Sequence, residues 1–487
     1  MLGPNFRATP NRVTMIRQLF VFSAFTAAAL AQQPFTIGNL VVVRVGDGAA
    51  PLTNASTATF LDEYTPAGVL VQTIAMPTTA TGANQPFTNS GTATSEGFLN
   101  FSQNGVYLTL AGYAAAPGTA AIATSPASVV ARVIARVDLA GVVDTTTTIT
   151  DGYNGVPAVP PSTTSTSGNP RSAVSVDGLS YWCSGTGATA NAGVRYVQHG
   201  ANTSLGLNAG APSNVRVAGI YNGQLYATSA STVYQSVCAV GTGLPTTSGQ
   251  PVTVLPGLPT TGGTGGPSAY DFWFADPQTL YIADDRATAG GGGGGVQKWT
   301  NANGTWTLQY ILQPATGCRG VTGRRINGVT TVYATAGNGQ LVSFVDNGAG
   351  SPATVLATAP TNTAFRGVRF LTKPTTLSRL PASCGAAGIQ ATGTGEVGTD
   401  VITTITGAQG IPFVGYGVTL FGLPFCGCTI VHDYLVLLPT TQSTLAIPSN
   451  PALLAVSLYI QGLDLGGLGG CPDPVFTLTD GFAFTIQ

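Results

Sequence analysis

The feature that most constrains the fold is a short strand-like run with an aliphatic-tyrosine pattern, which recurs five times along the chain. The runs are VYLTLAGY (106–113), LSYWCSG (179–185), QLYATSA (224–230), TLYIADD (279–285) and TVYATAG (331–337). Their tyrosines lie 74, 45, 55 and 52 residues apart, and NLVVVRVGDG at 39–48 reads as a sixth, degenerate copy. Repeats of about 40–50 residues are typical of β-propeller blades.

Each tyrosine run follows an alternating strand and a tight turn, and it precedes another hairpin pattern. The turns are mostly Asn-Gly or Asp-Gly pairs, as at Asp177-Gly178 and Asn222-Gly223, which favour two-residue hairpins. Four antiparallel strands per repeat predict an all-β propeller. The run AFRGVRFL (364–371) is a first strand with no repeat after it. We expect it to complete the first sheet, giving six blades closed by the N- and C-terminal strands. The alternatives are a large β-sandwich or an open array of sheets.

Six consecutive glycines at 290–295 follow one of these repeats. No Gly-Lys-Ser/Thr sequence follows them and no helix pattern begins there, so they do not form a phosphate-binding P-loop. The strand pattern resumes at Val296, so they are not a domain linker either. We predict a long, flexible loop between the second and third strands of the fifth blade.

Composition and the N-terminal residues point to export. Charged residues make up only 8% of the chain and the formal net charge is -1, which gives no electrostatic reason to expect nucleic acid or an anionic membrane. From Met15 the sequence reads MIRQLFVFSAFTAAALAQQ, with an A-x-A cleavage pattern at 29–31. We predict a signal peptide at 1–31, a mature chain from Gln32, and a secreted or cell-surface protein with no transmembrane anchor.

The pattern changes after the repeats, and we expect a β-propeller at 35–374 and a small β-sandwich at 380–487. The second segment has six or more strand-like runs and four of the seven cysteines, Cys384, Cys426, Cys428 and Cys471. Two disulfides are expected there, with Cys426 and Cys428 each paired to Cys384 or Cys471. A Cys₄ zinc site is the alternative, although C-x-C is not its usual spacing.

Two parts of the chain resemble secreted bacterial proteins. SCGAAGIQATGTGEVG, LVLLPTTQSTLAIPSNPALLAVSLYIQGLDL and LTDGFAFTIQ look like a C-terminal domain carried by secreted proteins of planctomycete-type bacteria. The segment from VVVRVGDG through TSEGFLNFSQNGVYLTLAGY is similar to uncharacterised secreted bacterial propeller proteins. The resemblance implies export and fold, and brings no catalytic residue.

One face of the predicted propeller carries the longer connections, at 113–128, 151–169, 184–193, 257–267 and 285–295, while the turns assigned to the other face are tight. Long loops on a rigid scaffold commonly carry binding. Aligning the six first strands places one column at the mouth of the channel on that face: Glu96, Arg171, Val215, Tyr270, Arg319 and Arg366, with Arg216 and Asp271 one residue further on.

The charged members of this column suggest recognition of a carboxylate, sulfate or phosphate group. We therefore predict ligand binding by Glu96, Arg171, Tyr270, Asp271, Arg319 and Arg366. The same residues could instead hold neighbouring blades together. Alanine at the three arginines separates these roles, because a blade contact would affect stability and leave binding unchanged.

Few residues of the sequence suggest metal binding or catalysis. Asp284 and Asp285, with Asp47, could bind calcium, but no D-x-D-x-D-G loop occurs and no cofactor is otherwise expected. A carboxylate pair for glycoside hydrolysis would come from Glu96, Asp271, Asp284 or Asp285. The two histidines, His199 and His432, lie in different predicted domains, and neither a G-x-S-x-G nor an H-E-x-x-H motif is present.

These patterns favour a non-enzymatic binding or surface-matrix protein that recognises an extracellular glycan or protein through the long-loop face. The C-terminal domain would be a possible means of cell-surface association. The alternative is a hydrolase or lyase acting on acidic extracellular polysaccharides.

Overall fold

The computed structural model describes residues 1, 3 and 33–487, apart from 161–163, 188–190, 209, 262–266, 289–292, 327, 373–376, 394, 396, 449, 454–455, 470, 473–474 and 487. Regular structure in these residues consists of β-strands and two short 3₁₀ turns, η1 (Ile122–Thr124) and η4 (Pro451–Leu453), so the predicted all-β class is confirmed. None of the described helices is long and apolar enough to cross a membrane. The predicted signal peptide lies outside the described residues except for positions 1 and 3.

Four of the sheets each contain four consecutive antiparallel strands, ordered along the sheet as they are along the chain. Their strands are β9 (Pro170–Val174), β10 (Ser180–Gly185), β11 (Gly193–Gln198) and β12 (Leu205–Gly206); β13 (Val215–Tyr221), β14 (Gln224–Ser229), β15 (Val237–Val240) and β16 (Val252–Val254); β17 (Ala269–Asp276), β18 (Thr279–Asp284), β19 (Gly295–Ala302) and β20 (Thr305–Leu312); and β21 (Cys318–Ile326), β22 (Val329–Ala336), β23 (Gln340–Val345) and β24 (Thr354–Thr358). The predicted repeat of four strands is therefore present.

The N-terminal strands form a nine-stranded sheet, which the sequence did not predict. Its strands are β1 (Leu40–Val45), β2 (Ser56–Tyr64), β3 (Leu70–Ala75), β4 (Thr88–Ser90), β5 (Leu99–Phe101), β6 (Tyr107–Tyr113), β7 (Arg132–Asp138), β8 (Val143–Ile149) and β25 (Ala364–Phe370). The short β4 pairs with both β2 and β6, and so joins two four-stranded groups. The strand predicted at 364–371 is β25, and it pairs antiparallel with β1.

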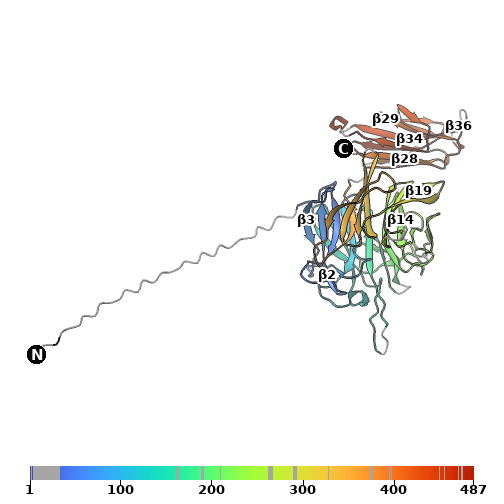
Figure 1. The fold of residues 1–487 in the computed structure, drawn as a ribbon. Coiled ribbons are helices and arrows are strands. Elements are labelled where there is room, and N and C mark those ends of the chain that lie inside the picture. Colours follow the sequence, from blue (N-terminus) through green and yellow to red (C-terminus); the bar gives the residue numbers. More distant parts are fainter. Residues whose placement is uncertain are drawn as a thin grey trace. The chain divides into compact units, whose positions relative to one another are not determined.

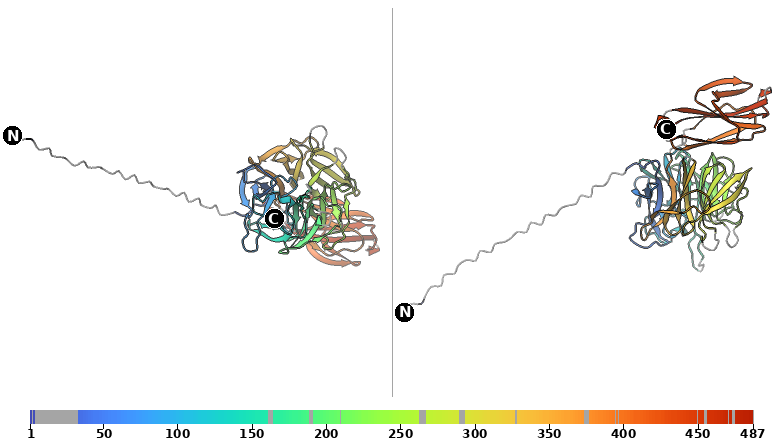
Figure 2. Two further views of the ribbon diagram at one scale, coloured as in Figure 1. Left: turned by 90° about the horizontal axis from the view of Figure 1, so that it is seen from below. Right: turned by 45° about the horizontal axis from the view of Figure 1, so that its top comes forward.

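The sheets stand around a common axis, and the blue N-terminal strands lie beside the orange strands that end with β25 (Figure 2, left). Neighbouring sheets bury apolar faces against each other. Tyr281 and Val296 of one sheet share a core with Val332 and Phe344 of the next. This arrangement is that of a β-propeller, with β5, β9, β13, β17, β21 and β25 innermost.

The connections alternate between two faces, as expected for antiparallel meanders, but their lengths differ from the prediction. Most loops between second and third strands are long, for example 114–131 between β6 and β7, but the loop between β22 and β23 is only 337–339. The opposite face, on which all turns were expected to be tight, also carries longer connections at 241–251 and 346–353. We keep the names long-loop face and tight-turn face for these two sides, although the contrast is less complete than predicted. The glycine run lies between β18 and β19, as predicted, with only Gly293–Gly295 of it described.

The C-terminal residues form two packed sheets and a hairpin (Figure 1). The strands are β26 (Ser378–Leu380), β27 (Gly388–Thr392), β28 (Asp400–Thr406), β29 (Ile411–Gly417), β30 (Leu420–Phe425), β31 (Cys428–His432), β32 (Val436–Leu438), β33 (Gln442–Ala446), β34 (Ser457–Leu465), β35 (Cys471–Pro472) and β36 (Val475–Thr485). Val401 and Ile405 of the three-stranded sheet share a core with Val414 and Ile460 of the six-stranded sheet.

Three cysteines of these sheets, Cys384, Cys426 and Cys428, are disulfide-bonded. Cys384 is bonded to Cys428, one of the two pairings expected for Cys428, and Cys426 is also disulfide-bonded. A Cys₄ zinc site is therefore excluded, because bonded sulfurs cannot serve as thiolate ligands. The free cysteines among the described residues, Cys183, Cys238 and Cys318, are buried in the propeller.

Candidate functional site

The innermost strands share an irregularity that positions the predicted column. Each of β9, β13, β17, β21 and β25 has a bulge or register shift near its start, where it pairs with the second strand of its sheet. The residues at these shifts include Arg171, Arg216, Tyr270, Arg319 and Arg366. Bulges redirect side chains and are frequent beside functional sites, so a repeated backbone feature brings these five residues to the same end of the channel.

Glycine allows two of these bulges to form close to the channel axis. Gly320 and Gly367 directly follow Arg319 and Arg366. A Cβ at Gly367 would lie 2.4 Å from the backbone nitrogen of Leu99 on a neighbouring strand. An Arg-Gly pair at the start of a first strand is thus the sequence signal of this geometry.

Hydroxyl groups opposite the bulges fix the backbone of the column. Ser184 donates to the carbonyl of Arg216 at 2.8 Å, and Thr335 donates to the carbonyl of Arg366 at 2.5 Å. Thr228 donates in the same way to the carbonyl of Tyr270. Because each bond joins a second strand to the first strand of the next sheet, the column is held by the scaffold rather than by its loops.

Four arginines gather around one tyrosine, and we call this set the arginine mouth: Arg171, Arg216, Arg319 and Arg366 around Tyr270. The guanidinium of Arg216 lies 3.8 Å and that of Arg319 5.8 Å from the centre of the Tyr270 ring. Arg171 and Arg366 are near enough to this ring to interact electrostatically with it. Val215, which the alignment placed in the column, is instead buried in an apolar core. Its neighbour Arg216 reaches the mouth because the bulge shifts the register.

Two of these arginines also contact the next sheet, and Arg366 contacts the segment that follows β4 in its own sheet. Arg171 donates to the side chain of Asn214 at 2.5 Å and to the carbonyl of Val215 at 3.1 Å. Arg216 donates to the carbonyl of Ala269 at 2.8 Å, and Arg366 to that of Gly91 at 2.9 Å. The predicted blade contacts therefore exist.

These contacts leave donors unused. Arg171 and Arg366 are only 7% and 4% exposed, and the buried Nε of each has no hydrogen-bond partner among the described residues. Arg132, a fully buried arginine elsewhere in the propeller, uses all three of its guanidinium nitrogens as donors to the Tyr153, Val130, Ser125 and Gly168 carbonyls and the Ser125 hydroxyl. An arginine that serves packing alone is satisfied in this way, and Arg171 and Arg366 are not.

The charge of the mouth is only partly balanced. Arg319 is paired with Asp285 at 3.5 Å, but no ion pair between described residues joins a carboxylate to Arg171 or Arg366. Burial and the nearby Arg216 lower the pKa of Arg171 to about 10. Burial and Arg319 lower the pKa of Arg366 to about 10 in the same way. Both remain charged at neutral pH, so a buried anion would be favoured here.

Glu96 lies beside the mouth without pairing to it. It is fully buried and accepts bonds from the Tyr113 hydroxyl at 2.6 Å, Asn169 at 2.5 Å and the Ser90 amide at 2.8 Å. Burial raises its pKa, against the lowering effect of these bonds and of Arg366. Its oxygens are therefore already occupied by protein donors.

The structure separates Asp271 from the other predicted site residues. Both of its oxygens accept bonds from Arg369, at 2.6 and 2.9 Å, and one also accepts the Val321 amide. Arg369 in turn donates to Asn100, whose amide donates to the carbonyls of Ala173 and Ala218. This network, the channel plug, joins all the innermost strands. Asp271 is directed to Arg369 and not to the arginines of the column, because adjacent residues of a strand point in opposite directions, and its part in ligand binding stays a prediction.

The remaining candidates are occupied within the protein. Asp284 is paired with Arg286 and accepts a bond from Gln297, and Asp285 accepts one from Ser268. The described residues contain no group of three potential metal ligands, and calcium binding stays a prediction. His199 lies 3.3 Å from Asp144, and His432 is buried in the C-terminal sheets.

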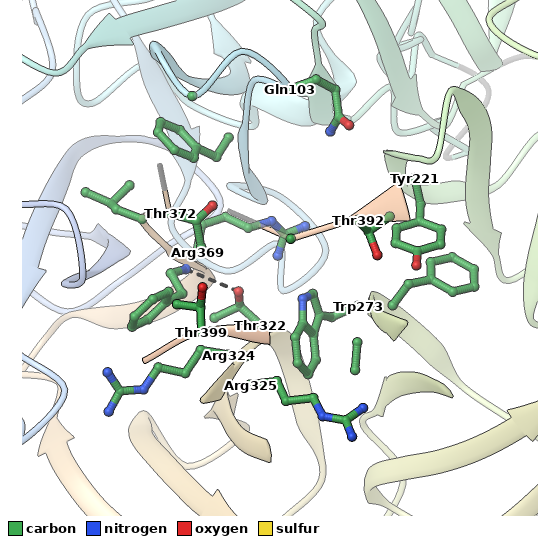
Figure 3. Close-up of a pocket in the computed structure, with 18 of the residues that line it drawn as sticks. Gln103, Tyr221, Trp273, Thr322, Arg324, Arg325, Arg369, Thr372, Thr392 and Thr399 are labelled. Carbon is green, nitrogen blue, oxygen red and sulfur yellow. Dashed lines mark hydrogen bonds between the residues drawn. The ribbon is translucent and has the colours of Figure 1, made fainter. Parts of the chain in front are cut away.

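The other end of the channel opens into a cavity of about 700 Å³, which was not predicted from the sequence. Its wall comes from the tight-turn ends of the innermost strands and from Thr392, Gly393, Val397, Thr399, Asp400 and Ile402 of the C-terminal sheets. Figure 3 shows Trp273, Thr322 and Arg369 around it, with Gln103 and Tyr221 on the far wall. The tight-turn face, expected to serve stability alone, therefore carries a candidate site as well.

Comparisons with known proteins give the chain no family. No known protein family and no curated protein matches it. The resemblance of the C-terminal residues to a planctomycete-type domain therefore stays a prediction.

Solved structures give only distant matches. Dihydro-heme d1 dehydrogenase NirN in complex with DHE is 11% identical with a TM-score of 0.33, over 68% of this chain and 57% of that chain, so the match spans little more than half of NirN. An arginine-to-alanine triple mutant of AofleA from Arthrobotrys oligospora is 12% identical with a TM-score of 0.33, over 72% and 86%. The Cps50 (Swd1) β-propeller domain from Myceliophteria thermophila is 11% identical with a TM-score of 0.29, over 81% and 97%. The propeller assignment here rests on strand pairing rather than on these matches.

Proposed function

We propose that this chain is a secreted, non-enzymatic binding protein that recognises acidic groups of an extracellular glycan through the arginine mouth. The observation that carries the proposal is the pair of buried arginines, Arg171 and Arg366, whose Nε donors are unfilled and whose charges have no paired carboxylate. Guanidinium groups bind carboxylate, sulfate and phosphate in a bidentate manner. An anion would supply both the missing acceptors and the missing charge.

The architecture we propose for the scaffold is a propeller of six blades at 35–374, closed by β25 on β1, followed by a β-sandwich at 380–487. The pairing of β25 with β1 supports closure, and the channel plug supports six inner strands around one axis. Export is proposed from the signal-peptide pattern before Gln32. A protein carrying acidic side chains is the alternative ligand, and the C-terminal sheets are the proposed means of surface association.

A hydrolase or lyase for acidic polysaccharides is the second candidate. The observation in its favour is Glu96, whose pKa is raised by burial as a general acid requires. Against it, Glu96 is fully buried with three donors on its oxygens, and Asp271 is committed to Arg369. Since neither carboxylate is free, binding is the better supported function.

The test incubates mature protein from Gln32 with neutral, carboxylated and sulfated polysaccharides. Co-sedimentation and release of reducing or unsaturated ends are measured in the same samples. Arg216→Gln and Arg319→Gln are the variants of choice, because these arginines are less buried than Arg171 and Arg366. Arg379→Gln is the matched control, since it removes the same charge from a side chain that is 68% exposed on the C-terminal sheets.

We expect retention on acidic polysaccharides without product, reduced about 10-fold or more in each mouth variant and unchanged in Arg379→Gln. Product release by wild-type protein would support the enzyme instead. Equal retention by all variants would refute the arginine mouth as the binding site.

A further inference from the structure

The cavity at the tight-turn end of the channel differs chemically from the arginine mouth. Its volume of about 700 Å³ lies within the ~300–1,000 Å³ typical of small-molecule sites. Apolar side chains such as Ile37, Phe101 and Ile220 alternate with amides, hydroxyls and arginines along its wall. The class of ligand that fits therefore depends on whether the charged groups of the wall are paired.

Apart from Arg324, the charged groups of this wall are paired. Arg369 is paired with Asp271 at 2.6 Å. Arg325 is paired with Asp276 at 3.1 Å and with Asp400 at 3.2 Å. The guanidinium of Arg324 lies 5.3 Å from the centre of the Phe370 ring, and in Figure 3 it and that of Arg325 point outward in opposite directions. Little uncompensated charge is left to attract an anion.

The polar groups that face the cavity are neutral. The indole nitrogen of Trp273 points toward its middle, and the Gln103 amide points in from the opposite side (Figure 3). The hydroxyl of Tyr221 lies close to Thr392 and Asn222 but has no well-formed hydrogen bond among the described residues, and it is buried. A buried hydroxyl without a well-formed bond is unfavourable, so a ligand that bonds to it would be stabilised once a small shift of the ring or of Thr392 exposes it.

We propose that this cavity binds a neutral carbohydrate, of the size of a small oligosaccharide. A sugar offers several hydroxyls that both donate and accept, which matches the indole, amide and hydroxyl groups spread around the wall. Its less polar ring faces fit the apolar residues between them. The proposal does not depend on the arginine mouth, because it uses other residues at the opposite end of the channel and requires no anion.

The experiment measures binding of maltotriose, cellotriose, xylotriose and N-acetylglucosamine to the full mature chain by saturation-transfer difference NMR and calorimetry. Tyr221→Phe removes the unpartnered hydroxyl and keeps the ring stacked on Phe274, whose centre lies 4.6 Å away. Gln103→Ala shortens an exposed side chain at the cavity rim. Gln309→Ala is the matched control, because Gln309 is exposed on β20 and does not line the cavity.

We expect at least one neutral saccharide to bind, with affinity about 3- to 10-fold lower in Tyr221→Phe and in Gln103→Ala and unchanged in Gln309→Ala. The melting temperature of Tyr221→Phe should be equal to that of wild type or higher, so weaker binding would not reflect misfolding. Sulfate should not compete. Absence of binding for every saccharide, or equal affinity in all variants, would overturn the proposal. Competition by sulfate would overturn it too, and would assign the signal to the arginine mouth.

Discussion

Two arginines of one strand, three residues apart, behave in opposite ways. Arg369 lies in the channel plug, where Asp271 neutralises it and Asn100 and Val321 accept further bonds. Arg366 lies in the arginine mouth, where its neighbours are other arginines and its Nε has no partner. Both side chains are largely buried, so burial alone does not distinguish structural arginines from candidate binding residues. The state of their hydrogen-bond partners does.

The largest effect should come from breaking the channel plug. Arg369→Met leaves the fully buried Asp271 without its counter-ion, and the loss of a buried partner typically costs about 3–5 kcal/mol. Urea unfolding measures this loss. The double variant Asp271→Asn/Arg369→Met should lose less than the sum of the two single variants, because neither charge is then left unpaired. Additive losses would show that the two residues do not act as a pair.

The next effect concerns a buried histidine that resists protonation in the folded protein. His432 is fully buried, its Nε2 has no partner among the described residues, and burial lowers its pKa to about 4. The unfolded chain, with an ordinary histidine pKa near 6.5, takes up the proton first. Stability from His432 is thus fully present above about pH 6.5 and is lost as the pH falls to 4, by up to about 3 kcal/mol.

Unfolding free energies of wild type and His432→Gln, measured between pH 7 and 4, test this expectation. The variant should lose less stability over that range. Parallel curves would mean that His432 does not titrate differently in the two states.

Arg366→Met should cost far less than Arg369→Met. It removes one bond, to the Gly91 carbonyl, but it also removes a buried charge that is repelled by the nearby Arg319. We expect a loss of about 1–2 kcal/mol in the same urea experiment. A loss as large as that of Arg369→Met would make the mouth a structural centre and would remove the distinction drawn here.

The smallest effect should be a change in how the stability of the protein depends on pH. The pKa of Glu96 is raised in the fold, mainly by burial. The contribution of Glu96 to the free energy of unfolding is therefore fully present below its pKa in the unfolded chain. This contribution is lost as the pH rises through its pKa in the folded protein. Glu96→Gln should flatten that decline, as followed by thermal unfolding from pH 4 to 8. An unchanged profile would show that Glu96 keeps an ordinary pKa.

Much of the scaffold could be predicted from sequence because it depends on local patterns. The tyrosine runs and Asn-Gly turns predicted the strands. The unpaired run at 364–371 predicted the partner of β1. The nine-stranded sheet could not be predicted, since β4 has only three residues and no strong pattern.

The site was predicted only in part, for a geometric reason. An aligned column of residues predicts how far along the channel the residues lie, but not which way their side chains point. Asp271 was therefore grouped with Arg171 although it faces Arg369. Bulges then moved Arg216 into the place expected for Val215. The cavity at the other end depends on strands far apart in the sequence and left no local signal.

The most direct test of the central claim, that the arginine mouth binds anions, is thermal unfolding in sulfate against chloride at equal ionic strength. Sulfate stabilises most proteins without a specific site, so the quantity of interest is the difference between wild type and Arg366→Met. The account predicts an extra, saturable stabilisation of wild type that reaches about 2.7 kcal/mol at 100 times the dissociation constant and is reduced or absent in the variant. An equal rise in both proteins, without saturation, would contradict it.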